Sequence, residues 1–168
     1  MEFKDTGKRI RIIIVFVIIL LVPFVMYMRK EHRLAKSREL YVSSKGYELA
    51  GSYKKAIEVL AEAMELNPDN PEIKTKIGEL YIRTGREEEG VDMLKGVSAE
   101  HPAYPDPYYH LAFYYYNRGD YRVSRTYWEA FLKRNKNPLY DDIAKRRISE
   151  IDGFQGNLTE ENSEFKED

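Results

Sequence analysis

Side chains that could act in catalysis or bind a metal are few and widely spaced in this chain. It has no cysteine and three histidines, His32, His101 and His110. The absence of cysteine excludes thiolate zinc sites, cysteine nucleophiles and a disulfide framework. The H-E-x-x-H pattern of zinc hydrolases, the phosphate-binding loop and the dinucleotide-binding glycine pattern are all missing. The sequence therefore predicts no catalytic residue, no cofactor and no metal ligand, and we expect the protein not to be an enzyme.

Two local features have an alternative interpretation as chemical sites. His101 and His110 flank a proline-rich turn and could ligate a metal, although two isolated histidines are more commonly ordinary polar residues. An acidic triplet, Glu87-Glu88-Glu89, lies where a helix is expected to begin, and negative charge there complements the helix dipole. We interpret both features as structural.

The charge of the chain is balanced as a whole but not locally. The 27 Lys and Arg residues against 28 Asp and Glu residues give a net charge of -1, so no nucleic-acid partner is expected. Residues 1–38 hold 9 basic and 3 acidic residues, and residues 153–168 hold 1 and 5. The acidic segment 153–168 has little apolar surface to bury, which predicts a disordered tail.

The segment from Ile12 to Met28 contains 17 residues without a charge. As a helix it is apolar on every face and spans roughly 26 Å, near the ~30 Å of a bilayer core. A cleaved signal peptide would carry a small-residue cleavage site, which does not follow Met28. A buried core helix would need a larger surrounding core than this chain supplies. The segment 12–28 therefore predicts a single-pass transmembrane anchor.

The anchor divides the N-terminal part of the chain into three segments. A basic tail over 1–11 precedes it, and residues 29–36, which contain no helix breaker, predict a helical stalk after it. Four basic residues before the anchor and five after it do not decide a positive-inside orientation. A short basic tail resists translocation, which favours a cytoplasmic N-terminus and a main domain on the outer side. The opposite orientation would place the second basic stretch against anionic lipid.

Four sets of residues recur at a spacing of 34. They are Gly51, Gly85 and Gly119; Tyr47, Tyr81 and Tyr115; Leu60, Leu94 and Trp128; and Pro68 and Pro102. Each unit is predicted to form two helices, with the glycine ending the first one as a C-terminal cap. In the first unit these helices cover 40–50 and 53–66, and Pro71 is placed to open the next unit.

This pattern of large, small and aromatic residues resembles the tetratricopeptide repeat (TPR) family. The three units are 37–70, 71–104 and 105–138, and apolar residues at helical spacing over 139–152 predict a capping helix, or alternatively a docking helix for a partner. The resemblance implies an all-α fold, a short TPR-type helical solenoid over 37–152 after a single transmembrane helix. Gly90 stands where the family usually has alanine, which is expected to weaken that helix by roughly 1 kcal/mol.

In this family the first helix of each unit lines a concave groove that holds a peptide or a partner helix. The resemblance therefore implies partner-binding positions in all three units, namely Tyr41, Lys45, Glu79, Arg83, Tyr109, Phe113, Tyr116 and Asn117. Glu48 and Thr75 fall on the same carried-over face. Some members clamp a C-terminal carboxylate with Lys and Asn, but Tyr41 and Glu79 stand at those positions here. A chaperone-tail adaptor is accordingly disfavoured.

Tyr109, Phe113 and Tyr116 share one face of a predicted helix. A stripe at helical spacing is often core. The core face of this helix is already supplied by other residues, so an exposed aromatic wall is the alternative. Two functions remain open. The protein is either a membrane-anchored scaffold that binds a protein or peptide in its groove, or a structural subunit that uses the aromatic face as a permanent interface in an oligomer, including a homo-oligomer.

Overall fold

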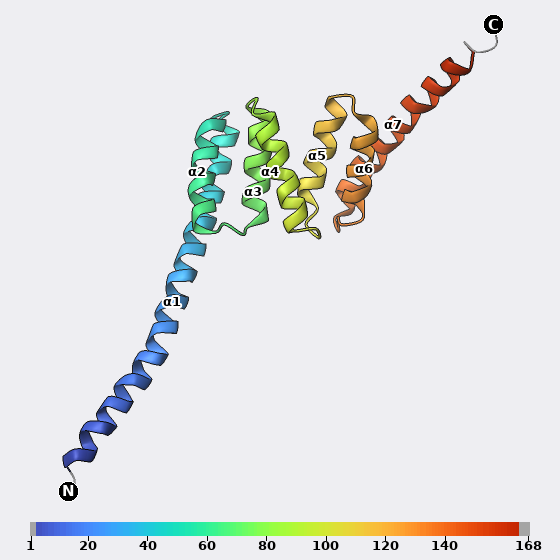
Figure 1. Ribbon diagram of the computed structural model, residues 1–168. Helices are drawn as coiled ribbons and strands as arrows, with labels where there is room; N and C mark the ends of the chain where they lie inside the picture. Colours follow the sequence, from blue (N-terminus) through green and yellow to red (C-terminus); the bar gives the residue numbers. More distant parts are fainter. Residues whose placement is uncertain (1–2, 165–168) are drawn as a thin grey trace.

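The computed structural model describes the backbone of residues 3–164 and the side chains of Arg11 and residues 14–154. The described part folds into seven α-helices. They are α1 (Phe3–Leu49), α2 (Tyr53–Leu66), α3 (Pro71–Arg83), α4 (Glu87–Glu100), α5 (Asp106–Asn117), α6 (Tyr121–Leu132) and α7 (Pro138–Glu164). Figure 1 shows α2 to α6 and the ends of α1 and α7 stacked as antiparallel pairs in chain order. The predicted all-α helical repeat is confirmed.

The turn inside each helix pair has the same geometry in all three units. Gly51, Gly85 and Gly119 have φ angles of 72°, 87° and 79°, in the left-handed region that favours glycine. The backbone N–H that follows each glycine donates to the carbonyl of the repeated tyrosine, over 2.8 Å to Tyr47 and 2.8 Å to Tyr81. This is the helix-ending motif that satisfies the last carbonyls. The 34-residue spacing of glycine and tyrosine therefore records one turn used three times.

The boundary between the first and second units is formed by a helix N-cap. Asn70 precedes α3, and its side-chain oxygen accepts hydrogen bonds from the backbone N–H groups of Glu72 (2.9 Å) and Ile73 (3.3 Å). Pro71 occupies the first helical position, where its missing N–H costs nothing. This cap stabilises the start of the second unit.

The apolar core runs along the stack between the helix pairs. One cluster joins α1, α2 and α3 around Leu60 and Ile77, and a second joins α5, α6 and α7 around Trp128. A smaller cluster around Leu94 and Leu111 joins α4 to α5. Within the stack, each helix therefore buries apolar side chains against its neighbours in sequence, as expected of a solenoid.

The backbones of α3 and α4 approach each other closely at Gly90. A Cβ built on Gly90 would lie 2.5 Å from the carbonyl oxygen of Gly78 and 2.9 Å from the backbone nitrogen of Ile82. Any side chain at position 90 would force the two helices apart. The sequence suggests only that Gly90 weakens its own helix. The structure shows that it permits the packing of the pair.

The two ends of the chain extend away from the stack (Figure 1). α1 is continuous across the predicted stalk 29–36, and α7 continues past the predicted capping helix 139–152 to Glu164. Within the described residues, no helix is both long enough and apolar enough to cross a membrane. The predicted anchor 12–28 includes Ile12 and Ile13, and the predicted tail includes residues 155–168. The side chains of both sets lie outside the described residues.

Candidate partner-binding groove

The first helices of the three units contribute one continuous face of the stack. The 34-residue register aligns three sets of positions on it. They are Val42, Lys76 and His110; Lys45, Glu79 and Phe113; and Leu49, Arg83 and Asn117. One face of α3, one face of α5 and the last turns of α1 therefore form a common surface.

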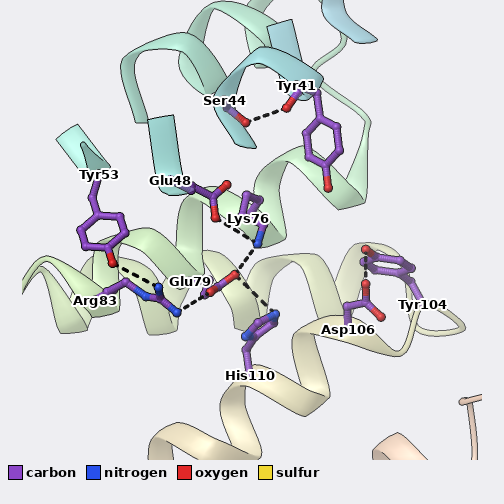
Figure 2. A network of polar contacts seen from close by, with 10 residues as sticks. All are labelled: Tyr41, Ser44, Glu48, Tyr53, Lys76, Glu79, Arg83, Tyr104, Asp106 and His110. Carbon is purple, nitrogen blue, oxygen red and sulfur yellow. Dashed lines mark hydrogen bonds and ion pairs between the residues drawn. The ribbon is translucent and has the colours of Figure 1, made fainter. Parts of the chain in front are cut away.

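A chain of polar contacts crosses this face from the first unit to the third (Figure 2). Lys76 donates to Glu79 over 2.7 Å and forms an ion pair with Glu48 of α1 over 3.4 Å. Glu79 also accepts from Arg83 over 3.3 Å. All but Arg83 are largely shielded from solvent. Because a buried charge is costly unless it is paired, these contacts hold α1 and α3 in a defined relative position.

His110 of α5 extends this chain of contacts into the third unit. Its Nε2 atom lies 3.9 Å from a Glu79 carboxylate oxygen. Burial lowers the pKa of His110, and the attraction of Glu79 only partly offsets that effect. Burial of Glu79 would raise its pKa, but His110, Lys76 and Arg83 outweigh it, so the pKa of Glu79 is lowered. At neutral pH the face therefore presents an ionised Glu79 beside a neutral imidazole.

A pocket of about 700 Å³ opens between α3 and α5. Its apolar lining is Ile82, Tyr109, Phe113 and Tyr114, and its polar lining is Glu79, Arg83, Glu87, His110, Asn117 and Arg118. Arg118 pairs with Glu87 over 2.9 Å on one side of it, and Arg83 pairs with Glu79 on the other. An apolar surface bordered by oriented polar groups is the usual character of a binding site.

The aromatic stripe on α5 packs against the C-terminal helices. The rings of Tyr109 and Phe113 lie 5.4 Å and 4.8 Å from that of Trp128, in edge-to-face geometry. The Tyr116 hydroxyl donates to Glu150 over 3.1 Å, and the Arg147 guanidinium lies 4.8 Å from the Tyr116 ring. The stripe is thus half-buried, because α7 covers part of the surface that the sequence would leave as an aromatic wall.

The structure brings five of the eight predicted binding residues together in the pocket. They are Glu79, Arg83, Tyr109, Phe113 and Asn117. Tyr41 and Lys45 lie apart from the pocket on α1, where the Lys45 ammonium is 4.7 Å from the Tyr41 ring. Tyr116 is directed toward α7. Whether any of the eight contacts a partner stays a prediction.

Several residues of this face are not among the predicted ones. Val42 is 64% exposed and Leu49 is 92% exposed, so both present apolar surface on this face. The 34-residue register could have identified both as residues of this face, because Val42 aligns with Lys76 and Leu49 aligns with Arg83. Glu87 and Arg118 lie beside the turns of their units, and no periodic pattern indicates that they border a pocket.

Within the described part of the chain, no group of three or more potential metal ligands lies close together. The face offers an apolar hollow with charged borders.

Comparisons with known proteins agree with the architecture. Residues 49–112 match the model of the tetratricopeptide repeat family. No curated protein matches the chain.

Solved structures with a similar fold share little sequence with the chain. The first TPR of Spaghetti (RPAP3) bound to the HSP90 peptide SRMEEVD is 18% identical, with a TM-score of 0.64 over 73% of this chain and 98% of that one. The Sgt2 TPR domain from Aspergillus fumigatus is 17% identical, with a TM-score of 0.62 over 74% and 82%. The Yersinia enterocolitica type III secretion chaperone SycD, in complex with a peptide of the translocator YopD, is 14% identical, with a TM-score of 0.62 over 72% and 93%. The family match, the repeated turns and these likenesses together show that the chain carries a helical solenoid of the tetratricopeptide repeat type.

Proposed function

We propose that this protein is a scaffold that binds a peptide or a segment of a partner protein in the groove formed by α1, α3 and α5. The observation that carries the proposal is the pocket between α3 and α5, with its apolar lining and its two bordering ion pairs. Two structures of similar fold were solved with a peptide bound, an HSP90 peptide in one and a YopD peptide in the other. These likenesses support the class of function and leave the partner open.

Site-directed photocrosslinking of the full chain tests this proposal. A photoreactive amino acid at Asn117, on the border of the pocket, is expected to give a discrete crosslinked species in cells. The matched control is the same amino acid at Asp92, an exposed position of α4 outside the pocket. Equal yields from both positions would overturn the proposal. Asn117 is preferable to Tyr109 or Phe113, because both of these also support Trp128.

We further propose that residues 12–28 anchor the scaffold in a membrane, with the N-terminus in the cytoplasm and the solenoid on the outer side. Support comes from 17 consecutive uncharged residues and from large apolar side chains over 14–28 that are exposed to solvent. Alkaline extraction of membranes from cells that express the full chain tests the anchoring, and release into the supernatant would contradict it. Protease protection of the C-terminal region in intact vesicles tests the orientation.

The alternative of a structural subunit that assembles through its aromatic face has less support. The aromatic stripe of α5 already packs against Trp128 and lies under Arg147 of α7. Detachment of α7 would be required before the whole stripe could contact another subunit. We therefore favour the groove.

A further inference from the structure

We infer that the pocket between α3 and α5 selects a partner segment in which a bulky apolar side chain is flanked by acidic residues. This inference rests on the proposed function, that the groove binds a segment of a partner, and it states the chemistry of that segment. Three features of the pocket carry it: an apolar lining, carboxylates that are already paired, and guanidinium groups that are not saturated.

The lining accounts for the apolar side chain. Ile82, Tyr109, Phe113 and Tyr114 contribute it, and the volume of about 700 Å³ exceeds that of one large side chain. Tyr109 and Phe113 are held rigidly, since their rings contact each other at 4.9 Å and both pack on Trp128. Rigid aromatic surfaces bind apolar groups at little entropic cost and dominate the binding energy of many interfaces.

Each carboxylate of the pocket already accepts hydrogen bonds from two groups of the protein itself. Glu79 accepts from Lys76 on one oxygen and from Arg83 on the other. Glu87 accepts from Arg118 (2.9 Å) and from the Tyr114 hydroxyl (3.3 Å), both on its Oε2 atom. A basic partner segment would have to compete with these intramolecular donors and would gain little net energy.

The guanidinium groups, in contrast, still have N–H donors that no described residue accepts. Among the described residues, Arg83 bonds only the Glu79 carboxylate and the Tyr53 hydroxyl, and Arg118 bonds only Glu87. Each guanidinium carries five N–H donors, so most of these donors are without a protein acceptor. The side chains of Arg83 and Arg118 are 51% and 56% exposed, and both line the pocket. Carboxylates are the ligands that match such donors best, through paired charge-assisted hydrogen bonds.

The first unit extends the same pattern along the groove. Lys45 lies over the Tyr41 ring and, within the described residues, forms no ion pair. It aligns with Glu79 in the 34-residue register, between the exposed apolar side chains of Val42 and Leu49. A partner segment long enough to leave the pocket toward α1 would again meet apolar surface beside a cation, the Lys45 ammonium.

Fluorescence anisotropy with the full chain in mild detergent tests the inference. The probes are two fluorescein-labelled hexapeptides with a central Leu-Phe pair, one flanked by aspartates and the other by lysines. We expect the aspartate-flanked peptide to bind at least about tenfold more tightly, because only its charges meet unsaturated donors. Arg118→Gln is expected to weaken its binding about fivefold or more, and the advantage is expected to shrink at high salt.

A matched control and a fold check keep the outcomes separate. Arg122→Gln changes an exposed arginine of α6 that does not line the pocket, and it should leave binding unchanged. The circular dichroism spectrum and melting temperature of each variant show whether the solenoid is intact. Equal or tighter binding of the lysine-flanked peptide, or no effect of Arg118→Gln, would overturn the inference. If neither peptide binds while Asn117 still crosslinks a partner, the inferred chemistry is wrong and the proposed function stands. If crosslinking fails as well, both fall.

Discussion

A single hydrogen atom in place of a methyl group decides how the second repeat unit packs. Gly90 of α4 faces the backbone of α3, with Gly78 and Ile82 too close to admit a side chain. Glycine costs a helix about 1 kcal/mol relative to alanine. The gain is an approach between helices that no other residue permits.

Gly90→Ala is expected to destabilise the protein by about 1–3 kcal/mol, because the overpacking outweighs the improved helix propensity. Gly96→Ala, in the same helix, has nothing within 4 Å of its new Cβ and is expected to stabilise by up to about 1 kcal/mol. Urea denaturation of both variants measures the difference. A Gly90→Ala variant as stable as Gly96→Ala would show that the α3–α4 pair has room to adjust.

Protonation of His110 is expected to make the free energy of unfolding depend on pH. Burial holds its pKa below the ordinary value of 6.5. Glu79 and Asp106 favour its protonation, and Lys76 and Arg83 oppose it. The unfolded state therefore binds a proton more readily than the folded state below about pH 6.5, and the free energy of unfolding falls as the pH is lowered through this range.

We expect His110→Gln to flatten this dependence. Between about pH 7.5 and pH 5.5 the variant should lose less stability than the wild type, because glutamine does not titrate. Carboxylates with lowered pKa values, such as Glu79, lose their contribution only below about pH 4.5, outside this window. Urea denaturation at the two pH values provides the measurement. Parallel pH profiles would show that the imidazole does not titrate differently on folding.

At the scale of the helix, α7 has two roles in the structure. It buries Ile151 and Ala144 against the last repeat unit, which closes the apolar end of the stack. It also places Arg147 over Phe113 and Tyr116, so that the aromatic stripe of α5 is partly covered. One helix therefore stabilises the solenoid and determines how much aromatic surface remains at the groove.

Ile151→Ala is expected to cost about 2–5 kcal/mol, the range for truncation of a buried aliphatic side chain. Because a solenoid is held together by contacts between neighbours, hydrogen exchange should accelerate in α6 and α7 more than in α1 and α2. Leu139→Ala, at a position that is 71% exposed, serves as the control and should change stability by less than about 0.5 kcal/mol. Uniform acceleration across all helices would mean that the stack unfolds as one unit.

At the scale of the whole molecule, α1 has two parts that differ in exposure to solvent: residues 14–28 are exposed, and its C-terminal part packs in the solenoid. Its apolar side chains over 14–28 are exposed, whereas Ser37 is fully buried and donates to the Ala63 carbonyl over 2.7 Å. Arg33 donates to the carbonyl of Leu66 at the end of α2. The solenoid therefore holds α1 from about Arg33 onward, and the preceding part of the helix extends beyond it.

Deletion of residues 1–28 is expected to leave the free energy of unfolding of the solenoid within about 0.5 kcal/mol of that of the full chain, because no described side chain of that segment is buried. Deletion of residues 1–38 removes Arg33 and Ser37 and should lower it clearly. Thermal and urea denaturation of both truncations, with the full chain in detergent, measure the effect. A large loss on the shorter deletion would place part of the folding energy in the apolar segment.

The sequence by itself determined the repeat. Gly51, Gly85 and Gly119 recur with their tyrosines because each turn needs a left-handed residue and a carbonyl acceptor within a few residues, and such local requirements leave a period in the chain. The same register places Arg83 and Asn117 at equivalent positions of their units. Their assignment to a groove came from the resemblance to the TPR family, whereas local geometry is enough to derive the repeat itself.

Only the tertiary structure decided which side chains from different units meet. Arg118 and Glu87 border the pocket with Arg83 and Glu79 although they are not in equivalent positions of their units. The aromatic stripe of α5 is partly covered because Arg147 of α7 lies over it, and Gly90 is required because α3 lies against it. Periodicity records which face of a helix is buried. It does not record which distant residue lies opposite, because that depends on the angle and spacing at which whole helices pack.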